Sequence, residues 1–237
     1  MDSVERYSRQ TMLPELGAEG QKRLSATKIL LVGAGGLGSP IATYLTAAGI
    51  GTLGIIDADK VSVSNLQRQT LYTEDEVGQS KVECAYKRLH GLNHEVGIRT
   101  YDCFLTKDNA AEIISGYDMV VDGCDNFATR FIINDICIAA GKPYIYGSIQ
   151  GLNGQVSVFG VPDASGKVHS YRDLYDESEL LSMEAPSKAV LGITPAVTGS
   201  VEANQVLQLA AGFGEPLIGK LWSIDLRTME SYIIDLP

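Results

Sequence analysis

The chain has 237 residues, of which 45% are hydrophobic and 20% charged, and 29 acidic against 19 basic side chains give a formal net charge of −10. This composition is typical of a globular protein. The length suits one large α/β domain, whose core is big enough to be stable without disulfides or bound metal ions. The acidic balance argues against a nucleic-acid partner, because phosphates require a basic face.

The sequence carries no sign of export or of a membrane span. The start MDSVERYSRQ has no apolar segment of the kind that a secretory signal contains. No apolar run reaches the roughly 18 residues that a spanning helix needs. The four cysteines form no C-x-x-C pair, so the spacing of zinc ligands is missing. We therefore expect a cytoplasmic protein with reduced cysteines and no structural zinc.

The first two thirds of the chain alternate between short apolar runs and longer helical patterns. Apolar runs bounded by glycine or polar residues predict strands, and segments without breakers or with helical spacing predict helices. The predicted strands are 28–32, 51–57, 96–101, 118–122 and 142–149, and the predicted helices are 37–48, 79–92, 108–115 and 127–140. This alternation predicts an α/β fold, a Rossmann-like three-layer sandwich with a mostly parallel sheet between helices.

After Ile149 the pattern changes. Alternating residues and turn signals predict a C-terminal antiparallel extension, followed by a helix over 195–211 and closing strands over 220–225 and 229–235. The intervening segment, about 162–193, has two prolines, several acids and little periodicity. We expect it to be a mobile crossover loop, since loops longer than ~12–15 residues are usually functional or mobile. No linker divides the chain, so residues 1–237 are interpreted as one domain.

A glycine-rich turn follows the first predicted strand. Gly33, Gly35, Gly36 and Gly38 fit the pattern G-x-G-x-x-G between a strand and a helix. Such glycines let the backbone approach a phosphate, and the helix N-terminus offers unpaired N–H groups. Asp57 ends the second predicted strand, 24 residues after Gly33, where an acid hydrogen-bonds ribose hydroxyls. The motif alone does not separate NAD, FAD and ATP, and a tight turn without a ligand is the alternative.

Three charged residues favour nucleotidyl transfer over hydride transfer. Negative charge accumulates on phosphate oxygens in the transition state, and Arg68 and Lys81 can neutralise it. Asp125 follows a predicted strand, so it lies at the carboxyl edge of the sheet, where it can hold Mg²⁺. Taken singly, these residues are better explained as a solvated arginine, a surface lysine and a helix N-cap, and it is their coincidence on one sheet edge that favours the functional interpretation.

Five ordered segments resemble the ThiF/MoeB/HesA family, the bacterial relatives of ubiquitin-activating enzymes. They are RYSRQ (6–10), GAGGLGSP (33–40), DADKVSVSNLQRQ (57–69), VGQSKVE (77–83) and DGCDNFATR (122–130). The resemblance implies an adenylyltransferase that uses ATP and Mg²⁺ to adenylate the C-terminal glycine of a small ubiquitin-like sulfur-carrier protein ending in Gly-Gly. A thiamine-thiazole (ThiS) carrier is favoured, with the molybdopterin (MoaD) type second.

The same resemblance implies roles for individual residues. Gly36 lies at the nucleotide, Asp57 holds the ribose, and Asn65, Arg68 and Lys81 bind phosphates. Asp125 takes Mg²⁺, and Arg9 acts across a homodimer interface on the ATP of the partner. Asp59, Ser64, Gln69 and Asn126 complete the implied nucleotide-binding set.

The sequence departs from the family at two places. Ser170 and Asp173 stand where many members have a zinc-binding cysteine pair, and the second pair is missing, so zinc is not expected. Ser187 stands about where many members have a cysteine, which puts a covalent sulfur relay in doubt and leaves sulfur to a separate persulfide-donating protein. The competing functions are an NAD-dependent oxidoreductase, an inert binding module for a ubiquitin-like partner, and a tRNA-modifying relative that the acidic charge disfavours.

Overall fold

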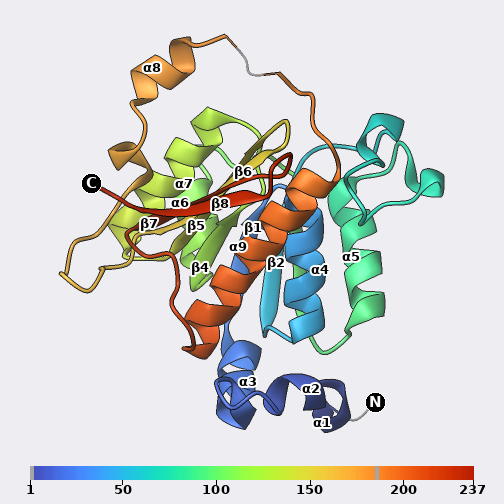
Figure 1. Ribbon diagram of the computed structural model, residues 1–237. Coiled ribbons are helices and arrows are strands. Elements are labelled where there is room, and N and C mark those ends of the chain that lie inside the picture. Colours follow the sequence, from blue (N-terminus) through green and yellow to red (C-terminus); the bar gives the residue numbers. More distant parts are fainter. Residues whose placement is uncertain (1–2, 185–186) are drawn as a thin grey trace.

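The computed structural model describes residues 3–184 and 187–237, which build one eight-stranded sheet of order β3-β2-β1-β4-β5-β6-β7-β8 (Figure 1). The strands are β1 (Lys28–Val32), β2 (Thr52–Ile56), β3 (Gly97–Tyr101), β4 (Met119–Asp122), β5 (Tyr144–Gln150), β6 (Asn153–Phe159), β7 (Lys220–Asp225) and β8 (Glu230–Asp235). The pairings among β1 to β5 are parallel, and those from β5 to β8 are antiparallel. This confirms the predicted α/β fold and its antiparallel extension.

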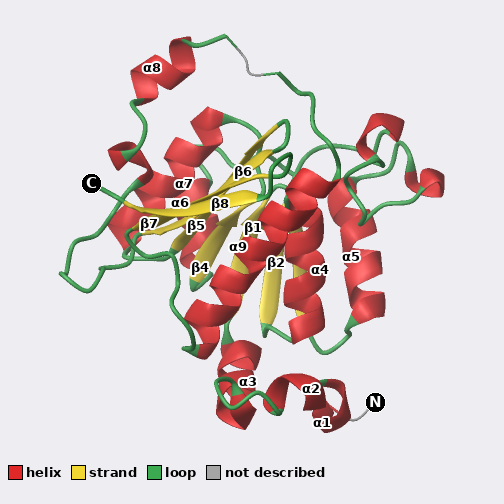
Figure 2. Ribbon diagram, viewed as in Figure 1, coloured by secondary structure: helices red, strands yellow, loops and turns green. Residues whose placement is uncertain are grey.

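Helices cover both faces of the sheet (Figure 2). On one face α4, α5 and α9 pack over a core that includes Leu31, Ile41 and Val206, and on the other α6 and α7 pack over Val120 and Phe131. The helices are α4 (Gly38–Ala48), α5 (Lys81–Leu92), α6 (Ala110–Ser115), α7 (Phe127–Ala140) and α9 (Ile193–Ala211). None of the helices in the described ranges is both long and apolar enough to cross a bilayer.

Three short helices precede the sheet and were not predicted from the sequence. They are α1 (Ser3–Arg6), α2 (Ser8–Thr11) and α3 (Gly17–Ala26). Few apolar side chains anchor them, chiefly Tyr7 and Leu24, so the segment shows no clear hydrophobic period. Side-chain hydrogen bonds also attach this segment to the rest of the fold. Asn93 donates to the Tyr7 hydroxyl at 2.8 Å, and Gln10 donates to the Ala48 carbonyl at 3.1 Å.

The crossover segment 162–193 contains more regular structure than the sequence predicted. It includes a 3-10 turn, η3 (Tyr171–Asp173), and a short helix, α8 (Glu177–Ser182). Tyr171 is 1% exposed and packs in the core, and Arg172 pairs with Asp135 of α7 at 2.7 Å. The early part of the segment is therefore fastened to α7, whereas no residue of α8 is buried.

Helix α9 lies unusually close to the antiparallel half of the sheet. A Cβ atom on Gly147 of β5 would lie 2.1 Å from Cδ of Glu202, and one on Gly154 of β6 would lie 2.1 Å from Oγ1 of Thr198. Glycine at these two positions is what lets the helix backbone and the strands approach to this distance.

Candidate functional site

The glycine-rich loop joins β1 to α4 in a turn too tight for side chains. Gly33 has φ +95°, and a Cβ atom there would lie 2.5 Å from the carbonyl oxygen of Gly123. A Cβ atom on Gly38 would lie 2.2 Å from the Gly33 carbonyl oxygen. The loop is thus pressed against the end of β4, and its glycines are required by close approach of the backbone.

The same loop offers unpaired donors at the start of α4. Among the residues that the structure describes, the N–H groups of Gly35, Gly36 and Leu37 have no hydrogen-bond acceptor. They lie at the positive end of the helix dipole, which is a general anion site. The Arg68 side chain runs alongside, with its Cδ 3.5 Å from the position that a Gly36 Cβ would take. The loop therefore fits the phosphate-binding role that its pattern predicted.

Asp57 holds the loop in place from the end of β2. Its Oδ2 accepts the N–H of Ala34 at 2.8 Å, and its Oδ1 accepts the N–H of Asp59 at 2.8 Å. On the opposite side, the buried Tyr72 hydroxyl donates to the Ala34 carbonyl at 2.7 Å. Burial, and next the negative charge of Asp57, raise the pKa of Tyr72 far above its usual range, so this donor stays protonated. Side-chain hydrogen bonds therefore fix Ala34 at both its N–H and its carbonyl.

Lys81, the first residue of α5, is buried beside the same carboxylates. Its residue is only 4% exposed, and its Nζ lies 2.8 Å from Oδ2 of Asp59 and 3.9 Å from Oδ2 of Asp57. A buried ammonium of this kind needs a paired anion, and Asp59 supplies it. The surface-lysine alternative is wrong, because this side chain is held inside the site.

The segment around η1 (Val63–Asn65) carries the remaining polar candidates. Arg68 is half-buried and donates from one Nη1 to the carbonyl of Ser64 at 3.0 Å, which leaves its other guanidinium donors available. Asn65 uses its Oδ1 to accept the N–H of Ser62 at 3.2 Å. Gln69 is 4% exposed, and its Oε1 has no hydrogen-bond partner within the described chain. The Gln69 amide lies beside the loop, with its Nε2 3.6 Å from where a Gly35 Cβ would be, and its unsatisfied oxygen marks a place where a ligand donor fits.

Asp125 and Asn126 follow β4 on the same edge of the sheet. Asn126 is the N-cap of α7, because its Oδ1 accepts the N–H of Thr129 at 2.9 Å. Asp125 is exposed, and its carboxylate makes no hydrogen bond or ion pair with any described residue. The helix-cap alternative therefore applies to Asn126 and not to Asp125, whose carboxylate is available.

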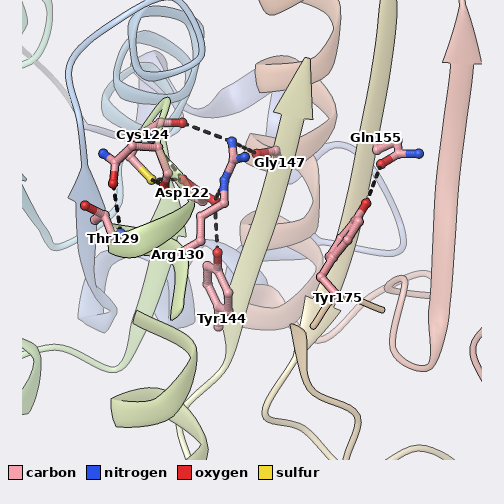
Figure 3. A network of polar contacts seen from close by, with 9 residues as sticks. Asp122, Cys124, Thr129, Arg130, Tyr144, Gly147, Gln155 and Tyr175 are labelled. Atoms are coloured by element: carbon pink, nitrogen blue, oxygen red, sulfur yellow. Dashed lines mark hydrogen bonds and ion pairs between the residues drawn. The ribbon is translucent and has the colours of Figure 1, made fainter. Parts of the chain in front are cut away.

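A buried polar network around Asp122, at the end of β4, was not singled out from the sequence (Figure 3). The fully buried Asp122 carboxylate accepts from Arg130 Nε at 3.0 Å and from the Tyr144 hydroxyl at 2.9 Å, both at Oδ2. Its Oδ1 accepts the N–H and the thiol of Cys124, at 2.9 and 2.8 Å. Asp122 and Arg130 are the first and last residues of the segment 122–130 that resembles the family, but the helical spacing alone gives no sign that Arg130 is buried.

Arg9 lies apart from every other candidate. It is exposed on α2, which contacts the ends of α4 and α5 remote from the glycine loop through Gln10 and Tyr7. The 11 residues of α4 span about 16 Å, so the edge next to α2 and the edge with the loop are opposite ends of the molecule. Figure 1 shows α2 at that far end. Within one chain, Arg9 does not join Arg68 and Lys81.

A metal would have few protein ligands here. Over residues 3–184 and 187–237, no group of three His, Cys, Asp or Glu side chains could hold a metal ion together. Mg²⁺ fits such a place when it is bound through one carboxylate and the oxygens of a nucleotide, and the available Asp125 carboxylate meets that condition.

Comparison with known proteins gives consistent relatives. The model of the ThiF family matches residues 7–236. The sulfur carrier protein adenylyltransferase of Thermus thermophilus is 44% identical over 228 residues, which cover 94% of this chain and 84% of that protein. The probable adenylyltransferase/sulfurtransferase MoeZ of Mycobacterium tuberculosis is 44% identical over 231 residues, covering 96% of this chain, which spans only 59% of the length of MoeZ.

Solved structures match the whole fold. The structure of PaaA superposes with a TM-score of 0.83 at 25% identity, covering 100% of this chain and 75% of that one. Escherichia coli MccB with ATP superposes with a TM-score of 0.83 at 25% identity, covering 98% of this chain and 70% of that one. These neighbours share the sheet and the helices that carry the glycine loop.

Proposed function

Since the chain belongs to the ThiF family, we propose that it uses ATP to adenylate the C-terminal glycine of a ubiquitin-like sulfur-carrier protein. The observation that carries this proposal is the gathering of charged groups around one glycine loop. Arg68 lies beside Gly36, Lys81 is buried behind Asp57 and Asp59, and Asp125 follows Gly123, whose carbonyl touches the loop. A hydride-transfer enzyme has no need of this set of cations, so it favours nucleotidyl transfer over an NAD-dependent oxidoreductase.

The chemistry needs no nucleophile from the chain itself. The carboxylate of the carrier attacks the α-phosphorus of ATP, an acyl–adenylate bond forms, and pyrophosphate leaves. The unpaired N–H groups of the loop bind phosphate oxygens, and Arg68, Asn65 and Lys81 compensate the charge that develops on them. Asp57 and Gln69 orient the nucleoside end. When bound at Asp125, Mg²⁺ supplies charge neutralisation and orientation for the leaving pyrophosphate.

We propose further that the site is completed in a homodimer. Arg9 is exposed at the far edge of its own chain, so it can serve a nucleotide only in a second copy. A surface suited to self-association lies next to the site: α4 and α9 together carry a single charged residue, Glu202, which is fully buried. At net charge −10 two copies repel each other, and a neutral face is where such repulsion is least.

The identity of the carrier is the finer part of the proposal. We favour a ThiS-type carrier, with MoaD second, and both end in Gly-Gly. The relatives support the class and not the choice: besides the Thermus protein, the SAMP-activating enzyme E1 of Haloferax volcanii is 38% identical over 95% of this chain and 83% of its own length. The exposed apolar side chains Leu181, Met183 and Leu191 of the crossover segment suit contact with the carrier tail.

The discriminating experiment is ATP–pyrophosphate exchange with a panel of purified carriers ending in Gly-Gly. We expect exchange that requires both the enzyme and one carrier, and that a carrier lacking its last glycine does not support. Carrier docking without exchange would favour the inert binding module. Binding of NAD in place of ATP would favour the oxidoreductase.

Subunit mixing tests the shared site. Arg9→Ala and Arg68→Ala chains are each expected to have strongly reduced activity alone. After verified subunit exchange the mixture should regain part of the activity, because one site of each heterodimer then has both arginines. No recovery would argue that Arg9 does not act across an interface.

A further inference from the structure

Asp122, Arg130 and Tyr144 form a buried hydrogen-bonded network at the end of β4, close in sequence to Asp125. Asp122 is 0% exposed and Arg130 5% exposed. Burial is the largest single influence and lowers the pKa of Arg130, but the charge of Asp122 together with Cys124 and the neighbouring tyrosines raises the pKa well above the usual range. Burial, and next Asp122, likewise raise the pKa of Tyr144 well above its usual range. All the donors into the Asp122 carboxylate therefore stay protonated.

This network forms hydrogen bonds with both the backbone N–H and the backbone carbonyl of Cys124. The N–H of Cys124 donates to Asp122 Oδ1 at 2.9 Å, and the carbonyl of Cys124 accepts from Arg130 Nη2 at 3.1 Å. That carbonyl belongs to the peptide bond that joins Cys124 to Asp125. Asn126 is fixed in turn by its capping hydrogen bond to the N–H of Thr129. Asp125 thus lies between two residues that hydrogen bonds hold in place, while its own carboxylate makes no such bond within the described residues.

Arg130 also ties the loop to the next strand. The same Nη2 donates to the carbonyl of Gly147 in β5 at 3.1 Å. Since Gly123 packs against Gly33 of the glycine loop, three structures meet here: the end of β4, the strand β5 and the phosphate loop. Figure 3 shows Arg130 reaching between Asp122, Cys124 and Gly147.

We propose that Asp122, Arg130 and Tyr144 are positioning residues that hold the 123–126 loop so that the Asp125 carboxylate meets the metal of the bound nucleotide. This inference rests on the proposed function, since it takes Asp125 as the metal ligand. The network itself does not touch the nucleotide. Its contribution is to remove the freedom of a loop that would otherwise have to be ordered when the metal and nucleotide bind.

The mildest test is Tyr144→Phe, which removes one donor to Asp122 and keeps the ring and the Asp122–Arg130 pair. The matched control is Tyr146→Phe, on the same face of β5 and 1% exposed, whose hydroxyl makes no contact with Asp122. Two readouts are taken on the full chain: amide hydrogen exchange in the peptide covering 122–129, and the affinity for Mn²⁺ in the presence of ATP, measured by electron paramagnetic resonance. ATP affinity in EDTA serves as the check on folding and nucleotide binding.

Tyr144→Phe should accelerate exchange in that peptide and weaken Mn²⁺ binding by about three- to tenfold, as expected for one lost hydrogen bond, while ATP affinity in EDTA and the Tyr146→Phe control stay as in the wild type. The effect on Mn²⁺ should vanish in an Asp125→Asn background, because the two residues act through one another. Additive effects, or an unchanged Mn²⁺ affinity in Tyr144→Phe, would overturn the positioning role alone. If Asp125→Asn by itself leaves Mn²⁺ affinity unchanged, the metal role in the proposed function falls, and this inference falls with it.

Discussion

Glu202 should destabilise the folded chain at neutral pH. Its carboxyl lies between α9 and β5, is fully buried, and has no hydrogen-bond partner for either oxygen within the described residues. Burial, and next the negative charge of Asp122, raise the pKa of Glu202 well above its usual range, against a smaller lowering by Arg130. Folding therefore favours the protonated form of this carboxyl.

The magnitude follows from linkage. An exposed glutamate in the unfolded chain has a pKa of about 4.3, and each pH unit above that value costs about 1.4 kcal/mol if the folded state stays protonated. This pH-dependent cost is absent below the unfolded pKa of the carboxyl, and it grows as the pH rises towards the folded pKa. Glu202→Gln escapes this cost, so its free energy of unfolding should exceed that of the wild type by a gap that widens by up to about 1.4 kcal/mol per pH unit above about 4.3, until the pH reaches the folded pKa.

Urea denaturation of both chains between pH 5 and 8, at one fixed chain concentration, measures this gap. All other titrating groups cancel in the difference. The control is Glu215→Gln, the same chemical change at an exposed position after α9, which should alter the free energy of unfolding by less than about 0.5 kcal/mol at every pH. A Glu202→Gln gap that does not grow with pH would refute the reasoning.

Three other outcomes are expected. Arg68→Ala should leave the fold intact, because the side chain is half-buried on a loop, and should lower pyrophosphate exchange by about 10²–10³, the effect of losing one transition-state donor. Tyr72→Phe removes the hydroxyl bonded to the Ala34 carbonyl, so unfolding should cost about 1 kcal/mol less in urea titration, and ATP should bind more weakly by calorimetry. Replacement of all cysteines by alanine should leave adenylation measurable by exchange, and elemental analysis should find no stoichiometric zinc; a carrier trapped covalently on a cysteine by mass spectrometry would contradict this. The cysteines concerned are Cys84, Cys103, Cys124 and Cys137.

The parallel half of the sheet and its glycine loop could be predicted because their signals are local. Apolar runs ending in glycine or aspartate fix the strands, and the pattern from Gly33 to Gly38 requires a turn without side chains whatever the rest of the fold. The position of Asp57 followed from the end of its strand. Lys81 and Asp59 were placed in the site, but their mutual ion pair depends on the 3-10 turns between them, which the sequence does not reveal.

The features that escaped prediction depend on partners distant in the sequence. Arg130 and Glu202 each look like the charged residue of an ordinary helix, and only the packing of α7 and α9 against β4 and β5 buries them. The helices α1 to α3 bury few apolar side chains and are held partly by polar contacts such as Gln10 with Ala48. Hydrophobic periodicity contains no information about interactions of this kind.

The close contacts of α9 limit which parts of the molecule can move during turnover. A Cβ atom on Gly199 would lie 2.6 Å from the Leu37 carbonyl oxygen, and the start of α9 abuts the loop, with Pro195 Cβ 3.2 Å from where a Gly36 Cβ would be. Together with the contacts at Gly147, these make α9, α4 and the sheet one rigid body, in which a sliding helix would collide with backbone. The displacements that the proposed reaction with a carrier requires are then expected elsewhere, for example in α8, none of whose residues is buried.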